Sequence, residues 1–222
     1  MVNLSQAHLG QRFVAGAWQP IAEETALQPL YNPGTGEVLA QAPLGGTADV
    51  DAAATAAVAA APAWRKLAGA DRGRLLDALA ERMTARRAEL AGLSVLNNGK
   101  LRSEAEQDVD DAIATYRHYA GVARHLPKAI AVGSVGEDLT MYRCFQPVGV
   151  SALIVPWNFP LMTTAWKVAP ALAAGCTVIL KPSEVTLLPE IVLGEIASAA
   201  GLPAGVLNIV PGAAAVGQAM VA

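Results

Sequence analysis

Two apolar runs, Gly149–Val155 and Thr177–Leu180, stand out in the hydrophobic pattern of the chain. Neither run alternates with polar residues, which is typical of strands that are buried on both faces of a sheet. The segment Leu161–Ala174 between them is long enough to form a crossover helix. Because parallel strands need such a crossover, the pattern predicts a β-α-β unit with two parallel strands.

The chain continues this alternation after the second run. Leu187–Ala200 has the pattern of a helix, Val206–Val210 that of a strand, and Ala213–Ala222 that of a further helix. Strands and helices that alternate in this way predict an α/β fold, here half of a doubly wound sheet.

The N-terminal segment has β patterning. Gln11–Pro20 has alternating apolar residues around Gly16, which predicts a short hairpin. Turn signals at Asn32–Gly36 then precede a predicted strand over Glu37–Ala42.

Three helices are predicted in the rest of the first half, over Val50–Ala61, Arg72–Leu96 and Glu104–Leu126. Pro62 predicts the end of the first helix, because proline removes a backbone donor. Each helix also follows a residue type that favours helix N-termini. These candidate caps are, in chain order, Thr47 or Asp49, Asp71 and Ser103.

The segment Ile130–Gln146 differs from its surroundings. Leu139–Phe145 alternates as a strand with two different faces. An exposed strand of this kind promotes aggregation unless another strand pairs with it. We therefore hypothesise that this segment mediates homo-oligomerisation.

Composition narrows the class of protein. The chain has 222 residues, 53% of them hydrophobic, which is typical of a globular protein. Its net charge of −3 argues against a nucleic-acid partner. The N-terminus lacks an apolar signal region, and the longest apolar run, Val168–Leu180, is too short for a membrane span of about 20 residues. These features predict a soluble cytoplasmic protein without a membrane partner.

Cysteine and histidine do not indicate a site of their own. Cys144 and Cys176 lie far apart, and neither has a nearby base or a cation placed to activate the thiol, so we expect both to be structural. His118 and His125 lack a matching cysteine or carboxylate cluster, so no metal site is predicted.

Polar residues gather where the two buried strands end. Trp157 and Asn158 follow the first strand, and Lys181, Ser183 and Glu184 follow the second. Ligands of open α/β sheets bind at the carboxyl ends of the strands, so these positions predict a binding site.

These polar residues allow more than one interpretation. The Asn158 amide could donate to a developing oxyanion, or Asn158 could occupy a left-handed turn. Glu184 could accept hydrogen bonds from the vicinal hydroxyls of a ribose, or could cap the next helix with Ser183. Gly212 and Gly217 form a G-x-x-x-x-G pattern that lacks the Rossmann spacing.

Three motifs carry a family resemblance: PWNFP at Pro156–Pro160, Lys167, and KPSE at Lys181–Glu184. Together they closely resemble the N-terminal, cofactor-binding half of the NAD(P)-dependent aldehyde dehydrogenase superfamily. The resemblance extends from Phe13–Trp18 to the VPG at Val210–Gly212. It implies a Rossmann-like doubly wound parallel sheet with N-terminal helices, in which 1–127 and 148–222 form the NAD(P)-binding domain and 128–147 a β-hairpin oligomerisation arm.

The resemblance also implies roles for individual residues. Asn158 is the expected oxyanion donor, and Lys167, otherwise a helix-surface lysine, is expected in a proton relay. The expected cofactor contacts are Val155, Pro156, Trp157, Lys181, Pro182, Ser183, Glu184, Gly212 and Gly217. The expected aldehyde channel is lined by Phe159, Thr163 and Trp166, although Phe159 and Trp166 also suit core packing.

The implied reaction is oxidation of a small-molecule aldehyde to a carboxylic acid through a cysteine thiohemiacetal and thioester. NAD is the expected cofactor, because Glu184 would repel a 2′-phosphate, and NADP remains an alternative. The expected assembly is a homodimer or homotetramer. Family members carry the nucleophilic cysteine and the base glutamate further downstream, so we expect the catalytic domain to be absent from this chain and the chain alone to be inactive. The alternative is a truncated, catalytically silent nucleotide-binding or assembly module.

Overall fold

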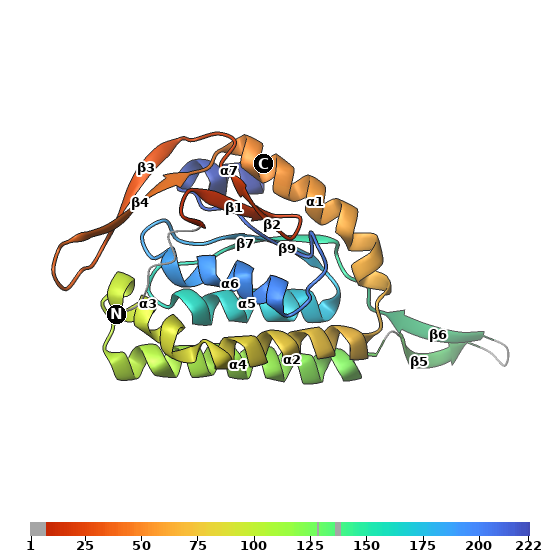
Figure 1. The fold of residues 1–222 in the computed structure, drawn as a ribbon. Coiled ribbons are helices and arrows are strands. Elements are labelled where there is room, and N and C mark those ends of the chain that lie inside the picture. The colour runs from red at the N-terminus through yellow and green to blue at the C-terminus, as the bar shows by residue number, and fades with distance from the viewer. Residues whose placement is uncertain (1–7, 128, 136–138) are drawn as a thin grey trace.

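The computed structural model describes residues 8–127, 129–135 and 139–222. A five-stranded sheet in the order β2-β1-β9-β8-β7 runs through the centre of the molecule (Figure 1). Its strands β7 (Val150–Ile154), β8 (Thr177–Lys181) and β9 (Leu207–Ile209) are mutually parallel. The predicted β-α-β unit and the α/β fold class are therefore confirmed.

Helices cover both faces of this sheet (Figure 1). On one face lie the crossover helices α5 (Pro160–Ala174) and α6 (Leu188–Ala199), and on the other lie α1 (Thr47–Lys66) and α7 (Ala214–Val221). Alternate residues of β8 divide between two apolar clusters. Val178 and Leu180 belong to the larger one and Ile179 to the smaller one beside α1 and α7.

Strands β1 (Gln11–Val14) and β2 (Ala17–Pro20) form an N-terminal hairpin, so the hairpin predicted over Gln11–Pro20 is confirmed. It also joins the main sheet, because Phe13 of β1 pairs antiparallel with Ile209 of β9. The sheet is thus mixed, with an antiparallel edge that was not predicted. A separate ribbon pairs β3 (Ala26–Tyr31), also not predicted, with β4 (Val38–Leu44).

Strand β7 corrects part of the sequence interpretation. All five residues of β8 are buried, as expected. Those of β7 are half-buried or exposed, because β7 is the last strand of the sheet in the described residues. Burial on both faces is therefore wrong for β7.

The predicted end of the first helix at Pro62 is also wrong, because α1 continues through this residue to Lys66. Proline in a helix interior costs about 3 kcal/mol. Trp64, two residues further on, is almost fully buried in the core. A buried tryptophan contributes about 3–5 kcal/mol, which offsets the cost of the proline.

The long predicted helix Arg72–Leu96 is two helices, α2 (Gly69–Ala85) and α3 (Arg87–Asn98). They are separated at Arg86, whose side chain donates to Glu89 and to Glu195 of α6. These two pairings raise the pKa of Arg86 above its usual range. The break lets one guanidinium join α3 to α6, a tertiary contact that no local pattern indicates.

Helix α4 (Arg102–His125) packs against α2 and α5 and completes the helical layer. The predicted caps Thr47, Asp71 and Ser103 all lie inside helices. The residues at the cap positions are Gly46, Ala68 and Leu101. Gly69, which opens α2, has no room for a Cβ: it would lie 2.1 Å from the Ala123 carbonyl oxygen, so packing between α2 and α4 sets this start.

The predicted arm contains an antiparallel hairpin of β5 (Ala129–Val135) and β6 (Leu139–Cys144), which projects from the body (Figure 1). Residues 128 and 136–138 of this arm lie outside the described residues. Large apolar side chains on both strands are exposed, namely Ile130, Val132, Leu139, Met141 and Tyr142.

Candidate functional site

The carboxyl ends of the three parallel strands meet at one edge of the sheet. The Val155 amide donates to the Lys181 carbonyl oxygen at 3.2 Å, and the Val210 amide donates to the Leu180 carbonyl oxygen at 2.9 Å. The segments that follow the strands therefore begin side by side. This brings together the predicted motifs PWNFP, KPSE and VPG, whose first residues are 25 and 29 positions apart along the sequence.

Lys181, the last residue of β8, makes the polar contacts that join the segments at this edge. Its side chain is almost fully buried, and its ammonium group donates to three acceptors. These are the Pro182 carbonyl oxygen at 3.0 Å, Glu184 Oε2 at 3.2 Å and the Gly212 carbonyl oxygen at 2.6 Å. An ammonium has three N–H donors, so all of them are used. Lys181 thus connects the KPSE turn to the turn after β9.

Glu184 is the accessible partner in this group, since one third of its side chain is exposed. A carboxylate with free lone pairs can accept from two vicinal hydroxyls. Lys181 can exchange its bond to Glu184 for a bond to the same hydroxyls. The residues present therefore fit a ribose. The alternative that Ser183 and Glu184 cap the next helix is wrong, because α6 begins at Leu188 with Leu187 at its cap position.

The loop from Val155 to Phe159 carries the second motif. Val155 is buried, whereas Trp157 is 61% exposed. The carbonyl oxygen of Trp157 accepts a hydrogen bond of 2.7 Å from Asn98 at the end of α3. Asn158 is exposed and does not adopt a left-handed turn, because the only non-glycine residue with positive φ in the described ranges is Ala15. That alternative for Asn158 is wrong, and its oxyanion role stays a prediction.

Helix α5 begins directly after this loop. Thr163 Oγ1 donates to the Phe159 carbonyl oxygen at 2.7 Å, and Lys167 donates to the Ile154 carbonyl oxygen at the end of β7. Phe159 and Trp166 are 38% and 55% exposed, so core packing does not explain either of them.

Phe159 is contacted by Lys100, which lies in the turn between α3 and α4. The Lys100 ammonium lies 3.5 Å from the centroid of its ring, in the geometry of a cation–π interaction. Lys100 also pairs with Asp108, which keeps the ammonium in place. The Asn98 and Lys100 contacts were not predicted. Their one signal is the run Asn97–Lys100, in which polar residues accumulate at a helix end.

A cavity of about 460 Å³ lies between α4 and α5 beside Trp166. Its wall combines aromatic and apolar groups with one carboxylate, that of Asp111, which accepts a hydrogen bond of 2.9 Å from Gln107. The lining residues are Asp111, Ala114, Thr115, His118, Tyr119, Met162 and Trp166. Aromatic faces together with a carboxylate suit a cationic group. Asp111 was not predicted to belong to a site.

The two glycines after β9 differ in their surroundings. A Cβ on Gly212 would lie 2.2 Å from Val216, so a side chain there would force the turn to change. A Cβ on Gly217 would meet nothing closer than 3.8 Å, and its nearest neighbour is Lys181. Gly212 is required by the turn itself, whereas Gly217 leaves space beside Lys181.

The remaining candidates form no further centre. Cys144 is exposed on β6 and Cys176 is buried. Within residues 8–127, 129–135 and 139–222, no three His, Cys, Asp or Glu side chains are grouped as a metal site. In the same residues, no helix is both long and apolar enough to span a membrane.

Comparison with known proteins gives a consistent family. The family model described as "Aldehyde dehydrogenase family" matches residues 18–222. Aminoaldehyde dehydrogenase 2 of Solanum lycopersicum is 40% identical over 206 residues, which cover 91% of this chain and 41% of that protein. Retinal dehydrogenase 2 of Homo sapiens is 41% identical over 204 residues, which cover 90% of this chain and 39% of that protein.

Solved structures agree in fold. Aldehyde dehydrogenase C from Pseudomonas syringae, in complex with NAD+ and octanal, superimposes with a TM-score of 0.94 at 33% identity. The match covers 100% of this chain and 45% of that one. The chain thus spans less than half the length of the relatives it matches.

Proposed function

The chain belongs to the aldehyde dehydrogenase family, and on this premise we propose that it supplies the NAD(P) site and the oxyanion donor of an enzyme that oxidises an aldehyde to a carboxylic acid. The observation that carries the proposal is the contact of Lys181 with both Glu184 and Gly212 at one edge of the sheet.

In this proposal Glu184 and Lys181 bind the adenosine ribose of the cofactor, and the turn at Gly212 lies beside it. The bound cofactor supplies the hydride acceptor. A carboxylate at position 184 favours NAD, because a 2′-phosphate would meet a like charge. A buried lysine beside that carboxylate reduces the repulsion, so we propose NAD as the preferred cofactor and NADP as a weaker one.

Asn158 would stabilise the oxygen of the aldehyde as it becomes an anion. Its amide is exposed at the end of β7, and the loop that carries it is held by Asn98. A fixed donor of this kind is worth about 3–4 kcal/mol in acyl-transfer enzymes. Lys167, which donates from α5 to the carbonyl oxygen of Ile154 at the end of β7, would exchange protons near the same loop.

We further propose that the aldehyde carries an amino or ammonium group. The cavity beside Trp166 offers aromatic faces and the Asp111 carboxylate, which together attract a cation more strongly than a neutral chain. Aminoaldehyde dehydrogenases and a betaine aldehyde dehydrogenase are among the relatives at 38–41% identity.

The projecting β5–β6 hairpin is the proposed site of homodimer or homotetramer formation. Its exposed apolar side chains would be covered by another copy. Light scattering on the wild type and on a Tyr142→Glu variant tests this. We expect an oligomer that the variant weakens, and a monomeric wild type would contradict the proposal.

Isothermal titration of the protein with NAD+ tests the cofactor site. We expect binding that weakens about tenfold in a Glu184→Ala variant, because two hydrogen bonds to the ribose are lost. Glu24→Ala is the matched control, since Glu24 is an exposed glutamate outside the site. A wild type that binds neither NAD+ nor NADP+ at millimolar concentration would contradict the proposal.

A further inference from the structure

We infer that Asp49, at the start of α1, is a positioning residue that holds the Pro211–Gly212 turn in the conformation the cofactor site requires. The inference rests on the proposed cofactor function. Among the described residues, Asp49 makes no hydrogen bond to Glu184 or Lys181. It acts through Gly45 and Gly46, which connect β4 to α1.

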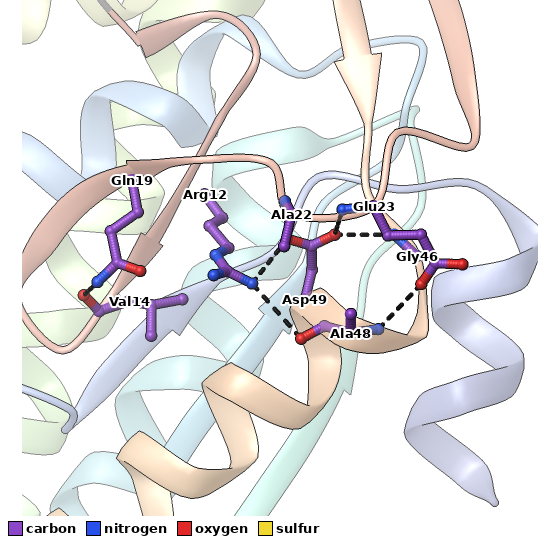
Figure 2. Close-up of polar contacts among 8 residues, drawn as sticks. All are labelled: Arg12, Val14, Gln19, Ala22, Glu23, Gly46, Ala48 and Asp49. Atoms are coloured by element: carbon purple, nitrogen blue, oxygen red, sulfur yellow. Dashed lines mark hydrogen bonds and ion pairs between the residues drawn. The ribbon is translucent and has the colours of Figure 1, made fainter.

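Asp49 is fully buried, and both of its carboxylate oxygens are satisfied. Figure 2 shows these partners approaching it from different parts of the N-terminal segment. Oδ1 accepts from Arg12 Nη1 at 2.7 Å and from the Ala22 amide at 2.8 Å. Oδ2 accepts from the amides of Glu23 at 3.2 Å and Gly46 at 3.0 Å.

This arrangement is specific for a carboxylate. A buried anion persists only when charge and hydrogen bonds compensate its desolvation. Arg12 provides the charge, and three backbone amides provide the remaining donors. An asparagine has the same shape but only one acceptor oxygen, so its NH2 group would face either two amides or Arg12 and an amide.

The glycine pair is wrapped tightly around this carboxylate. A Cβ on Gly45 would lie 2.9 Å from Asp49 Oδ2, and a Cβ on Gly46 would lie 2.5 Å from the Glu23 side chain. Glu23 in turn accepts a hydrogen bond of 3.0 Å from the Ala48 amide (Figure 2). The backbone at 45–46 is therefore fixed from two sides by acidic groups.

The fixed backbone reaches the candidate site through one hydrogen bond. The Gly45 amide donates to the Pro211 carbonyl oxygen at 2.9 Å. The next carbonyl oxygen, that of Gly212, accepts from Lys181 at 2.6 Å. Two consecutive carbonyls of the turn are thus held by two different elements, one controlled by Asp49 and one by the cofactor-site lysine.

Packing reinforces the same connection. Val50, which follows Asp49, lies in the apolar cluster that contains Val210 at the end of β9 and Val216 of α7. A Cβ on Gly212 would lie 2.2 Å from Val216, so the turn packs closely against α7. When Asp49 fixes the first turn of α1, it therefore also fixes the surface against which the Pro211–Gly212 turn packs.

The test compares Asp49→Asn with Leu76→Ala, a core variant in α2 that removes a fully buried side chain and lies outside this network. Amide hydrogen exchange is measured without ligand, and NAD+ affinity is measured by calorimetry at a temperature where both variants are folded. We expect the amides of residues 45–46 and 212–216 to exchange faster in Asp49→Asn, and we expect this variant to bind NAD+ about tenfold more weakly. Leu76→Ala should lower the melting temperature, but it should change neither the amide exchange rates in these segments nor the NAD+ affinity.

Each other outcome overturns the inference. Unchanged amide exchange at 212–216 in Asp49→Asn would mean that Asp49 does not hold the turn, whatever happens to NAD+ binding. Faster exchange with unchanged NAD+ affinity would mean that the turn does not matter to the cofactor. A wild type that binds neither NAD+ nor NADP+ would contradict the proposed function. The exchange rates would still show, independently of cofactor binding, whether Asp49 holds the turn.

Discussion

The Lys181 ammonium group donates a hydrogen bond of 2.6 Å to the carbonyl oxygen of Gly212 and so joins the end of β8 to the turn after β9. The two residues are 31 positions apart, and both belong to motifs that the sequence indicates separately. Since Lys181 also contacts Glu184, one buried cation fixes the two segments proposed to hold the cofactor.

Replacement of Lys181 by methionine should weaken NAD+ binding about 10- to 100-fold. The variant keeps the apolar stem but leaves the buried Gly212 carbonyl without its donor, and hydrogen bonds to charged groups contribute about 1.5–3 kcal/mol. Calorimetry measures the affinity. Lys66→Met, at an exposed lysine of α1, is the matched control and should bind as the wild type does. An affinity within twofold of the wild type would exclude this role for Lys181.

Replacement of Asn158 by alanine should lower aldehyde turnover of the holoenzyme by about 10²- to 10³-fold, the usual cost of removing an oxyanion donor. The melting temperature should not change, because the side chain is exposed and has no hydrogen-bond partner among the described residues. Steady-state kinetics and thermal unfolding measure the two effects.

Asn98→Ala separates donation from loop position. This variant removes the bond to the Trp157 carbonyl but retains the Asn158 amide. We expect a smaller loss of turnover than for Asn158→Ala. Equal losses in the two variants would indicate that the loop, and not the Asn158 amide, determines the rate.

Much of the fold follows from local pattern. The runs at β7 and β8 and the helix between them are set by apolar composition and length, which act locally, so the parallel unit is predictable. The edge that carries Lys181 and Glu184 follows from the same pattern. Family resemblance, not spacing, supplies the roles of Asn158 and Lys167.

Other features of the fold depend on contacts between residues that are far apart in the sequence, and the local sequence pattern does not predict them. At the helix break, the Arg86 side chain donates to Glu195, 109 residues away. The continuation of α1 through Pro62 depends on the burial of Trp64. Asp49 resembles an ordinary helix cap in sequence, and its link to Pro211 appears only when the chain is folded.

An Asp111→Asn variant tests the proposed preference for cationic aldehydes. Loss of the carboxylate should raise KM for 3-aminopropanal about three- to fivefold and leave KM for propanal unchanged. The effect is modest because partly exposed charges contribute about 1 kcal/mol or less. Asp110→Asn is the matched control, because the Asp110 carboxylate pairs with Arg87 at 2.6 Å and does not line the cavity. Equal changes for both aldehydes would contradict the preference.

Glu190, in the first turn of α6, should make the stability of the protein depend on pH. Its side chain is fully buried, and neither carboxylate oxygen has a hydrogen-bond partner among the described residues. Burial raises the pKa of this carboxyl group from 4.5 to about 8. Between these two values the folded protein keeps a proton that the unfolded chain releases.

The free energy of unfolding should therefore fall as pH rises from about 4.5 to 8 and level off above that range, with a slope of at most about 1.4 kcal/mol per pH unit from this group. A Glu190→Gln variant cannot ionise and should lose this slope, so it should be more stable than the wild type at pH 8 but not at pH 4.5. Urea unfolding at pH 4.5, 6, 7 and 8 measures the difference, with Glu24→Gln as an exposed control. Parallel pH profiles for the wild type and Glu190→Gln would show that folding does not change the pKa of Glu190 and would contradict this prediction.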